Sequence, residues 1–150
     1  MMDFKRSKYS RKLPHFDVGQ AYYHIVFRLR EGFLNETEIK VLKEYIRDND
    51  VGLYKLIAVQ VMGNHVHILL QPLESITLSE ILRRIKGGSA RVINILRNKN
   101  GSIWSDKYFD RVIRNQDDLN RTLEYLLYNP VKAGMADDGF RHYGWDFIQE

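Results

Sequence analysis

The strongest constraint on the fold of this chain is a pair of apolar segments separated by two turn-forming residues. Residues 54–62 (YKLIAVQVM) and 65–70 (HVHILL) are rich in side chains that favour strands, and Gly63-Asn64 stands between them. A loop of two residues joins neighbouring antiparallel strands, and glycine supplies the positive φ that such a turn requires. The pattern therefore predicts a β-hairpin.

Helices are predicted on either side of this hairpin. Capping patterns at 35–38 (NETE) and 77–80 (TLSE) precede apolar residues at helical spacing. They predict helices over about 36–49 and about 78–97, and the glycine pair at 87–88 is a weak point in the second helix.

The remaining segments complete an alternating order of elements. Residues 21–29 (AYYHIVFRL) and 108–113 (YFDRVI) predict two more strands, and 116–128 predicts a last helix that ends at Pro130. The order β-α-β-β-α-β-α predicts an α+β fold. We expect a ferredoxin-like four-stranded antiparallel sheet with helices on one face, plus a C-terminal helix.

Composition limits the class of protein further. The chain has 150 residues, 44% of them hydrophobic, so we expect one domain over 1–150, with an N-terminal arm at 1–17 and a C-terminal tail at 136–150. It has no cysteine, which excludes disulfide frameworks, thiolate metal sites and cysteine nucleophiles and fits a reducing compartment. No apolar run approaches the roughly 20 residues of a membrane span. We expect a cytoplasmic, nucleoid-associated protein with no membrane partner.

Two histidines lie two residues apart in the hairpin. The period of a strand puts His65 and His67 on one face, where two imidazoles together can bind one divalent cation. Two imidazolium groups there would repel each other, so the pair favours neutral rings or a metal. The alternative is a half-exposed pair without a function. Of the other histidines, His24 is placed to approach the pair, and we expect it to be a packed strand residue.

The last predicted helix carries a tyrosine and an asparagine side by side. Tyr125 and Asn129 are four residues apart, on the flank of a leucine stripe. A tyrosine can act as a nucleophile, and an amide oxygen can bind a hard divalent ion. Equally, Tyr125 can simply pack and Asn129 can end the helix before Pro130. Tyr128 is the competing nucleophile, but it lies farther from the Asn129 stripe.

Three stretches together resemble a known family. Residues 59–70 (VQVMGNHVHILL) resemble the histidine–hydrophobic–histidine (HUH) strand of single-tyrosine transposases, although Gly63-Asn64 stands where the family often has proline and an acidic residue. Residues 103–114 (IWSDKYFDRVIR) and 124–134 (EYLLYNPVKAG) resemble the signature of REP-associated tyrosine transposases, and 20–28 is similar to their first strand.

The resemblance implies a mechanism and a set of site residues. It implies that Tyr125 is the catalytic nucleophile, that His65, His67 and Asn129 bind a divalent metal, Mg²⁺ or Mn²⁺, and that the product is a 5′-phosphotyrosine link with a free 3′-hydroxyl. The implied substrate is single-stranded or hairpin DNA, cleaved and rejoined by a monomer or a homodimer. No nucleotide cofactor is implied, and the sequence contains no P-loop.

The basic residues are unevenly distributed. Lys and Arg number 23 against 19 acidic residues, and residues 81–105 contain no acidic residue. Such a segment favours phosphate contacts, although solvated helix surface is the simpler alternative. The predicted DNA contacts are Lys5, Arg6, Lys8, Arg11 and Lys12 in the arm, Arg83, Arg84, Lys86, Ser89 and Arg91 in the second helix, and Arg111 and Arg114 at the fourth strand.

Two other functions compete with the transposase-like enzyme. The first is a catalytically silent DNA-binding protein of the same fold, against which the intact set of His65, His67, Tyr125 and Asn129 argues. The second is a replication initiator or relaxase-type nicking protein, which shares the histidine strand. The small size and the stretch at 129–134 (NPVKAG) argue against the second.

Overall fold

The structure is a computed structural model that describes residues 21–48, 52–73, 76–132 and 146–147, with side chains up to residue 126 of the last helix. The elements, in chain order, are β1 (Tyr22–Leu29), α1 (Glu36–Asp48), β2 (Tyr54–Val61), β3 (His65–Pro72), α2 (Leu78–Arg97), β4 (Trp104–Ile113), α3 (Gln116–Lys132) and β5 (Asp146–Phe147). The predicted N-terminal arm lies outside the described residues, as does the tail apart from β5.

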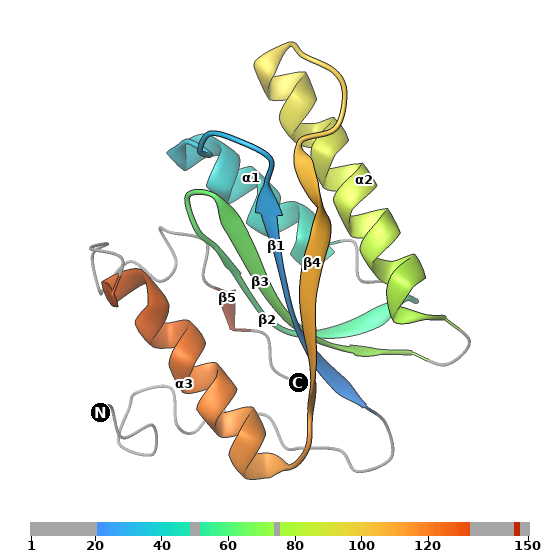
Figure 1. Cartoon of the computed structure of the whole chain (residues 1–150), viewed down its shortest axis with the longest axis vertical. Coiled ribbons are helices and arrows are strands. Elements are labelled where there is room, and N and C mark those ends of the chain that lie inside the picture. The colour runs from blue at the N-terminus through green and yellow to red at the C-terminus, as the bar shows by residue number, and fades with distance from the viewer. Residues whose placement is uncertain (1–20, 49–51, 74–75, 133–145, 148–150) are drawn as a thin grey trace.

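The strands form one antiparallel sheet in the order β4-β1-β3-β2-β5 (Figure 1). The first four strands have the ferredoxin-like order, so the predicted fold class is confirmed. The two-residue β5 adds a fifth strand beside β2, which the sequence did not predict.

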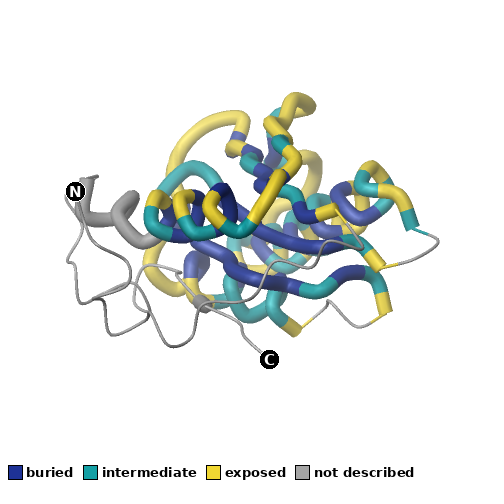
Figure 2. The backbone as a smooth tube through the Cα atoms, turned by 90° about the horizontal axis from the view of Figure 1, so that it is seen from below, coloured by how far each residue is buried: buried dark blue, intermediate teal, exposed yellow. Residues whose placement is uncertain are grey.

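The two faces of the sheet differ in composition. Alternate residues of the central strands, such as Ile25, Phe27 and Ile68, join the apolar residues of α1 and α2 in one buried core. The intervening residues, including His24 and His67, point to the opposite face, where α3 lies. Figure 2 shows that buried residues are concentrated on the strands and on the helix sides that face them. The helices α1 and α2 therefore cover one face, and the C-terminal helix covers part of the other.

The two capping patterns are realised differently. At the start of α1, the Asn35 amide donates to Glu38 Oε1 (2.9 Å), and the Glu38 amide donates to Asn35 Oδ1 (2.8 Å), a complete reciprocal box. At the start of α2, the Glu80 amide donates to Thr77 Oγ1 (3.1 Å), but the Glu80 carboxylate binds two arginines of its own helix instead.

The glycine pair in α2 does not interrupt the helix. A Cβ atom built on Gly88 would lie 1.6 Å from the Tyr45 hydroxyl oxygen, so the absence of a side chain lets α1 approach α2 closely. The expected weak point is therefore a packing contact.

The hairpin turn forms where the sequence predicts it, but Gly63 does not adopt the expected positive φ. The turn is held from outside. The Leu29 amide donates to the Asn64 carbonyl oxygen (2.9 Å), and the Leu34 amide donates to the Gly63 carbonyl oxygen (2.6 Å). These two bonds, one from the end of β1 and one from the β1–α1 connection, fix the turn backbone without the left-handed conformation.

The fourth strand and the last helix are longer than predicted. β4 begins at Trp104 rather than at residue 108, because Trp104 pairs with Leu29 and packs edge-on against Phe27. α3 continues past Pro130 to Lys132. Proline removes the amide that would bind the carbonyl four residues back, that of Leu126, and the Gln60 side chain of β2 donates to this carbonyl instead.

Candidate active site

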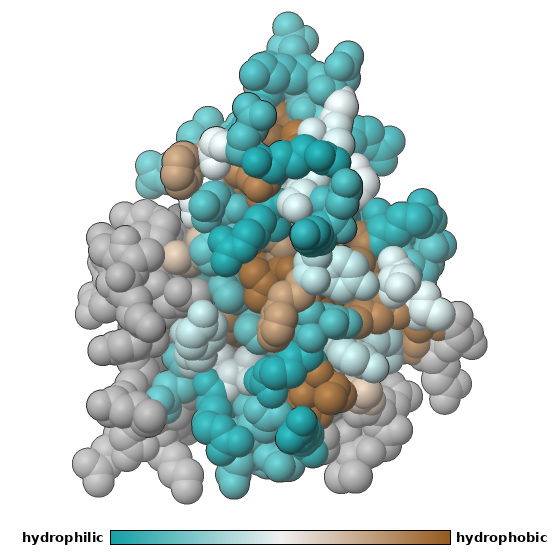
Figure 3. Space-filling model, in the orientation of Figure 1, coloured by the Kyte–Doolittle hydropathy of each residue, from teal (hydrophilic) through white to brown (hydrophobic). Residues whose placement is uncertain are grey.

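A cleft of about 1340 Å³ lies on the polar face of the sheet, between β1, β3, β4 and α3. Its lining includes His24, His65, His67 and Tyr125, so the structure brings together the predicted histidine pair and the predicted nucleophile. Figure 3 shows hydrophobic surface along the middle of the molecule in the orientation of Figure 1, with hydrophilic side chains around it.

The predicted histidine pair faces the cleft from β3. The ring centroids of His65 and His67 are 5.0 Å apart. Each ring is oriented through its Nδ1 atom: His65 Nδ1 lies 2.8 Å from Asn64 Oδ1, and His67 Nδ1 lies 3.0 Å from His24 Nε2. His24 is buried against the pair, as expected for a packed strand residue.

The environment keeps all three rings neutral at physiological pH. Burial is the main cause that lowers the pKa of His65 to about 4, with the Arg28 charge adding to it. Burial also lowers the pKa of His67 to about 3, with further contributions from His24, His65 and Arg28. For His24, burial and then the Arg111 charge lower the pKa to about 4, against an opposing effect of Asp118. Neutral imidazole is the form that binds a metal.

The donor set fits a divalent metal in part. His65 and His67 supply two neutral nitrogen donors from rigid strand positions, and hydrogen bonds at Nδ1 are the usual way to direct Nε2 at a metal. Among the described residues, no group of three or more His, Cys, Asp or Glu side chains could hold a metal ion. Within the described part of the chain, a third protein ligand would have to be of another type. Asn129 lies in α3 one turn after Tyr125, but its side chain is outside the described set, as is that of Tyr128.

Tyr125 reaches the histidines from α3. Its ring centroid lies 5.9 Å from that of His67 and 6.4 Å from that of His24, and the side chain is 47% exposed. The leucine stripe beside it, at 119, 123 and 126, is fully buried. The helix therefore uses the leucines for packing and presents the phenol to the cleft.

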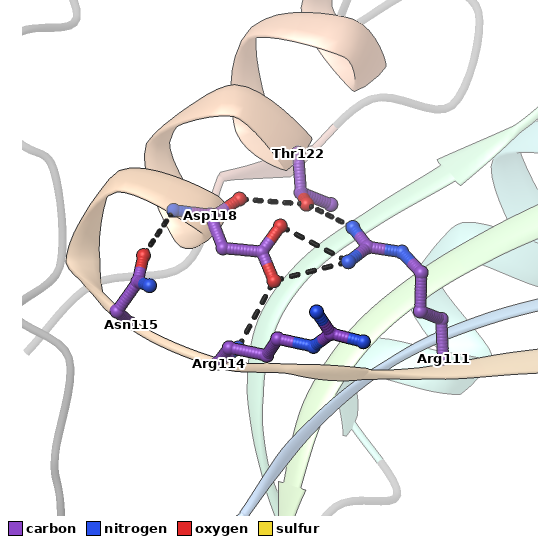
Figure 4. Close-up of polar contacts among 5 residues, drawn as sticks. All are labelled: Arg111, Arg114, Asn115, Asp118 and Thr122. Carbon is purple, nitrogen blue, oxygen red and sulfur yellow. Dashed lines mark hydrogen bonds and ion pairs between the residues drawn. The ribbon is translucent and has the colours of Figure 1, made fainter.

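A network of polar contacts holds the first half of α3 on β4 (Figure 4). Arg111 donates through Nη1 to both carboxylate oxygens of Asp118 (3.0 Å each) and through Nη2 to Thr122 Oγ1 (2.8 Å). Asp118 Oδ2 also accepts from the Arg114 amide (3.0 Å), and Asn115 caps the helix at the Asp118 amide (2.8 Å). Burial alone would raise the pKa of Asp118, but the bonds from Arg114 and Arg111 outweigh it and leave the pKa below its usual value.

The predicted DNA contacts on α2 lie away from the cleft. None of the α2 residues lines it. Arg83 and Arg84 are exposed and paired with Glu80, and Arg91 is exposed. Lys86 Nζ donates to the Ser105 carbonyl oxygen (2.8 Å).

Ser89 is removed from the predicted DNA contacts. It is fully buried, and its hydroxyl accepts a hydrogen bond from Trp104 Nε1 (2.9 Å). The hydroxyl therefore joins α2 to β4 inside the protein, where DNA cannot reach it.

Arg111 and Arg114 have different positions. Arg111 lines the cleft, but its guanidinium is hydrogen-bonded to Asp118 and Thr122. Arg114 lies directly after β4, and its side chain is exposed. The five predicted contacts in the N-terminal arm lie outside the described residues.

Several cleft residues were not predicted from the sequence. Five basic side chains and two acidic ones line the cleft, and the basic ones not predicted are Arg28, Arg30, Lys107 and Arg121. Arg28 pairs across the sheet with His65. It alternates with His24 on β1, and this spacing could have predicted that Arg28 lies on the same face as the histidines. Phe109, which also lines the cleft, could have been found in the same way once the register of β4 was known.

Comparisons with known proteins identify the family of the chain. The profile of the family described as "Transposase IS200 like" matches residues 17–129. A protein of Haemophilus influenzae named as a REP-associated tyrosine transposase is 28% identical over 94 residues, which are 56% of this chain and 53% of that protein. The chain thus matches about half the length of that curated relative.

Solved structures share the fold. A REP-associated tyrosine transposase bound to a REP hairpin superposes with a TM-score of 0.61 at 17% identity, covering 91% of this chain and 76% of that one. A protein of Deinococcus radiodurans, described as a transposase, gives a TM-score of 0.57 at 21% identity, covering 80% of this chain and 95% of that one.

The fold and the family profile together define the class as tyrosine transposase. Within it, the chain belongs to the IS200-like transposase family. In the part of the chain that the structure describes, no helix is long and apolar enough to cross a membrane.

Proposed function

We propose that this protein cleaves and rejoins single-stranded DNA that carries hairpins, with Tyr125 as the nucleophile. The observation that carries the proposal is the approach of the Tyr125 ring to His67 across an open cleft whose charged lining residues are mostly basic. A half-exposed phenol beside two neutral imidazoles is suited to attack on a bound phosphodiester.

The reaction balances without an external energy source. Tyr125 Oη forms a bond to phosphorus, and the bond between phosphorus and the 3′ oxygen breaks. The tyrosine proton is released to solvent, and the departing 3′ oxygen takes up a proton to become a 3′-hydroxyl. The product is a 5′-phosphotyrosine link, from which the 3′-hydroxyl can displace the tyrosine and restore the diester.

We assign the metal site to His65, His67 and Asn129. A divalent ion, Mg²⁺ or Mn²⁺, supplies charge neutralisation at the scissile phosphate when bound. The protein's own part is to keep both imidazoles neutral by burial and to fix their orientation through Asn64 and His24. These contacts orient the ring nitrogens before DNA arrives, so less reorganisation is needed during the reaction.

The lining of the cleft supports DNA as the partner. Arg28, Lys107 and Arg121 line it with the histidines, and they make no ion pair with another described residue. Cations on a sheet face that also carries aromatic rings suit a flexible, unpaired strand. We propose a hairpin as the element that presents this strand, as in the structural relative bound to a REP hairpin.

The test is a covalent-adduct assay. Wild-type protein is incubated with hairpin-bearing single-stranded DNA and Mg²⁺ or Mn²⁺, and adducts are resolved on a denaturing gel. We expect an adduct that disappears in Tyr125→Phe and on chelation of the metal, and that persists in Tyr128→Phe, the matched control on the same helix. An adduct retained in Tyr125→Phe and lost in Tyr128→Phe would reassign the nucleophile.

The alternative is a catalytically silent DNA-binding protein. It shares the cleft and its cations, so binding alone does not separate the two functions. Tight metal-independent binding to hairpin DNA without any adduct, across substrates with varied flanks, would favour this alternative.

A further inference from the structure

Phe109 exposes half of its side chain inside the cleft. Phenylalanine is usually buried, although a single exposed apolar residue needs no special explanation. The position of this residue is what distinguishes it. Phe109 lies on β4 opposite Val26 and faces the same side of the sheet as His24 and the histidine pair.

The ring is held close to the proposed reaction centre. His24 and Phe109 contact edge to face, with centroids 6.0 Å apart and planes at 78°. The His24 ring also neighbours those of Tyr125 at 6.4 Å and His67 at 5.3 Å. Phe109 and Tyr125 are therefore neighbours of the same buried imidazole, and both side chains line the same cleft.

Basic residues surround this ring. Lys107 and Arg111 lie two residues before and after it on β4 and share its face of the sheet, and Arg28 and Arg121 line the same cleft from β1 and α3. A phosphodiester chain that crosses the ring thus finds basic side chains in the same cleft, of which Arg111 is already paired with Asp118. An exposed aromatic ring between cations is the arrangement by which proteins bind unpaired nucleic acid.

We propose that Phe109 is the stacking platform for one unpaired nucleobase of single-stranded DNA, close to the phosphate that Tyr125 attacks. This proposal rests on the proposed function, since it assumes that the cleft holds a single strand. Lys107 and Arg28 contact the flanking phosphates. Stacking depends on the aromatic face that every base has, so the platform fixes where the strand lies without choosing a particular base.

The first test is equilibrium binding without cleavage. Fluorescence polarisation follows a fluorescein-labelled oligonucleotide that has a hairpin and a single-stranded flank, in EDTA. Phe109→Ala should weaken binding about 5- to 150-fold, which corresponds to about 1–3 kcal/mol of stacking at 1.4 kcal/mol per tenfold change. The slope of log affinity against log salt should stay unchanged, because no phosphate contact is removed. In Phe109→Trp, binding should be retained and the new indole fluorescence quenched by DNA.

Tyr108→Ala is the matched control. Tyr108 is the adjacent aromatic residue of β4, is exposed to a similar extent (41% against 50%) and also borders the cleft. Its ring, however, lies 5.8 Å from Lys86 Nζ of α2, on the other face of the strand. Removing this ring should leave DNA affinity within twofold of the wild type.

A stacking role is separated from a folding role by two further measurements. Phe109→Leu keeps an apolar side chain but has no aromatic face, so it should bind as weakly as Phe109→Ala while its thermal unfolding matches the wild type. An abasic scan of the single-stranded flank should find one position at which loss of the base weakens the wild type but has no further effect on Phe109→Ala. This non-additivity identifies a direct contact.

The outcomes separate this proposal from the proposed function. Unchanged binding by Phe109→Ala, or additive losses at every abasic position, overturns the platform, while the Tyr125 adduct still supports the enzyme. Absence of single-strand binding by the wild type overturns both.

Discussion

The two faces of the sheet have opposite compositions. Toward α1 and α2, residues such as Ile25, Phe27 and Ile68 are completely buried and make apolar contacts. Toward α3, the same strands present His24 and His67, buried but polar, at the wall of an open cleft. Because side chains alternate along a strand, the same strands supply the apolar core on one face of the sheet and the candidate active-site residues on the other. We therefore expect substitutions on the first face to affect mainly stability and those on the second to affect mainly reaction and binding.

The largest effect on stability is expected at the apolar face. Phe27 is fully buried and packs edge-on against Trp104 at 4.7 Å. Phe27→Ala should lower the free energy of unfolding by about 3–5 kcal/mol, through lost burial and the cavity left behind. Urea unfolding followed by circular dichroism measures this loss. A loss below about 1 kcal/mol would contradict the view that the apolar face mainly determines stability.

A smaller loss of stability, with a clear effect on the reaction, is expected at the contact between β4 and α3. The Asp118 carboxylate accepts bonds from Arg111 and from the Arg114 amide and is mostly buried. Asp118→Asn should lower the free energy of unfolding by about 1–3 kcal/mol. Since α3 carries Tyr125, adduct formation should slow while single-strand affinity stays within twofold. Asp117→Asn, an exposed neighbour in the same helix turn, is the control and should change neither.

The Glu38–Arg97 pair should make stability depend on pH. Arg97 binds both carboxylate oxygens of Glu38, at 2.7 and 3.0 Å, and these bonds are the main reason that the pKa of Glu38 lies below its usual 4.5. A carboxyl group with a lowered pKa in the folded state adds stability above the unfolded pKa and loses it as the pH falls through the folded pKa. Glu38→Gln should therefore cost about 1–2 kcal/mol at pH 7. The difference from the wild type should shrink below about pH 4.5, in urea titrations at several pH values.

The smallest effect is expected at the second capping pattern. Glu80 pairs with Arg83 and Arg84 on the surface of α2, where solvent screens the charges. Glu80→Gln should leave the thermal midpoint unchanged, in contrast to Glu38→Gln. An equal loss in both variants would show that burial does not distinguish the two caps.

Periodic features of the chain were predictable from sequence. The strand period put His65 and His67 on one face, and the helix period separated Tyr125 from the leucine stripe, because both patterns depend on local geometry alone. The order of strands and helices followed from the same patterns and from the two-residue turn before His65.

Features that depend on contacts between distant segments were not predictable. Phe109 and Lys107 belong to the cleft because β4 pairs with β1 in one register. Ser89 looked like a surface residue on a basic helix, but the Trp104 indole buries and binds it. Where α3 continues past Pro130, the Leu126 carbonyl oxygen lacks its helical donor. The Gln60 side chain, 66 residues away in the chain, donates to this oxygen instead.

The bond between Gln60 and Leu126 also determines how α3 can move. Within the body of a helix, each backbone carbonyl already accepts from the amide four residues ahead, so a carbonyl that lacks this amide gains most from an outside donor. Pro130 leaves the Leu126 carbonyl without that amide, and Gln60 uses it. The contact thus selects one position of α3 along its axis, directly after Tyr125, and a slide of the helix along the sheet would leave both Leu126 and Gln60 without their partners.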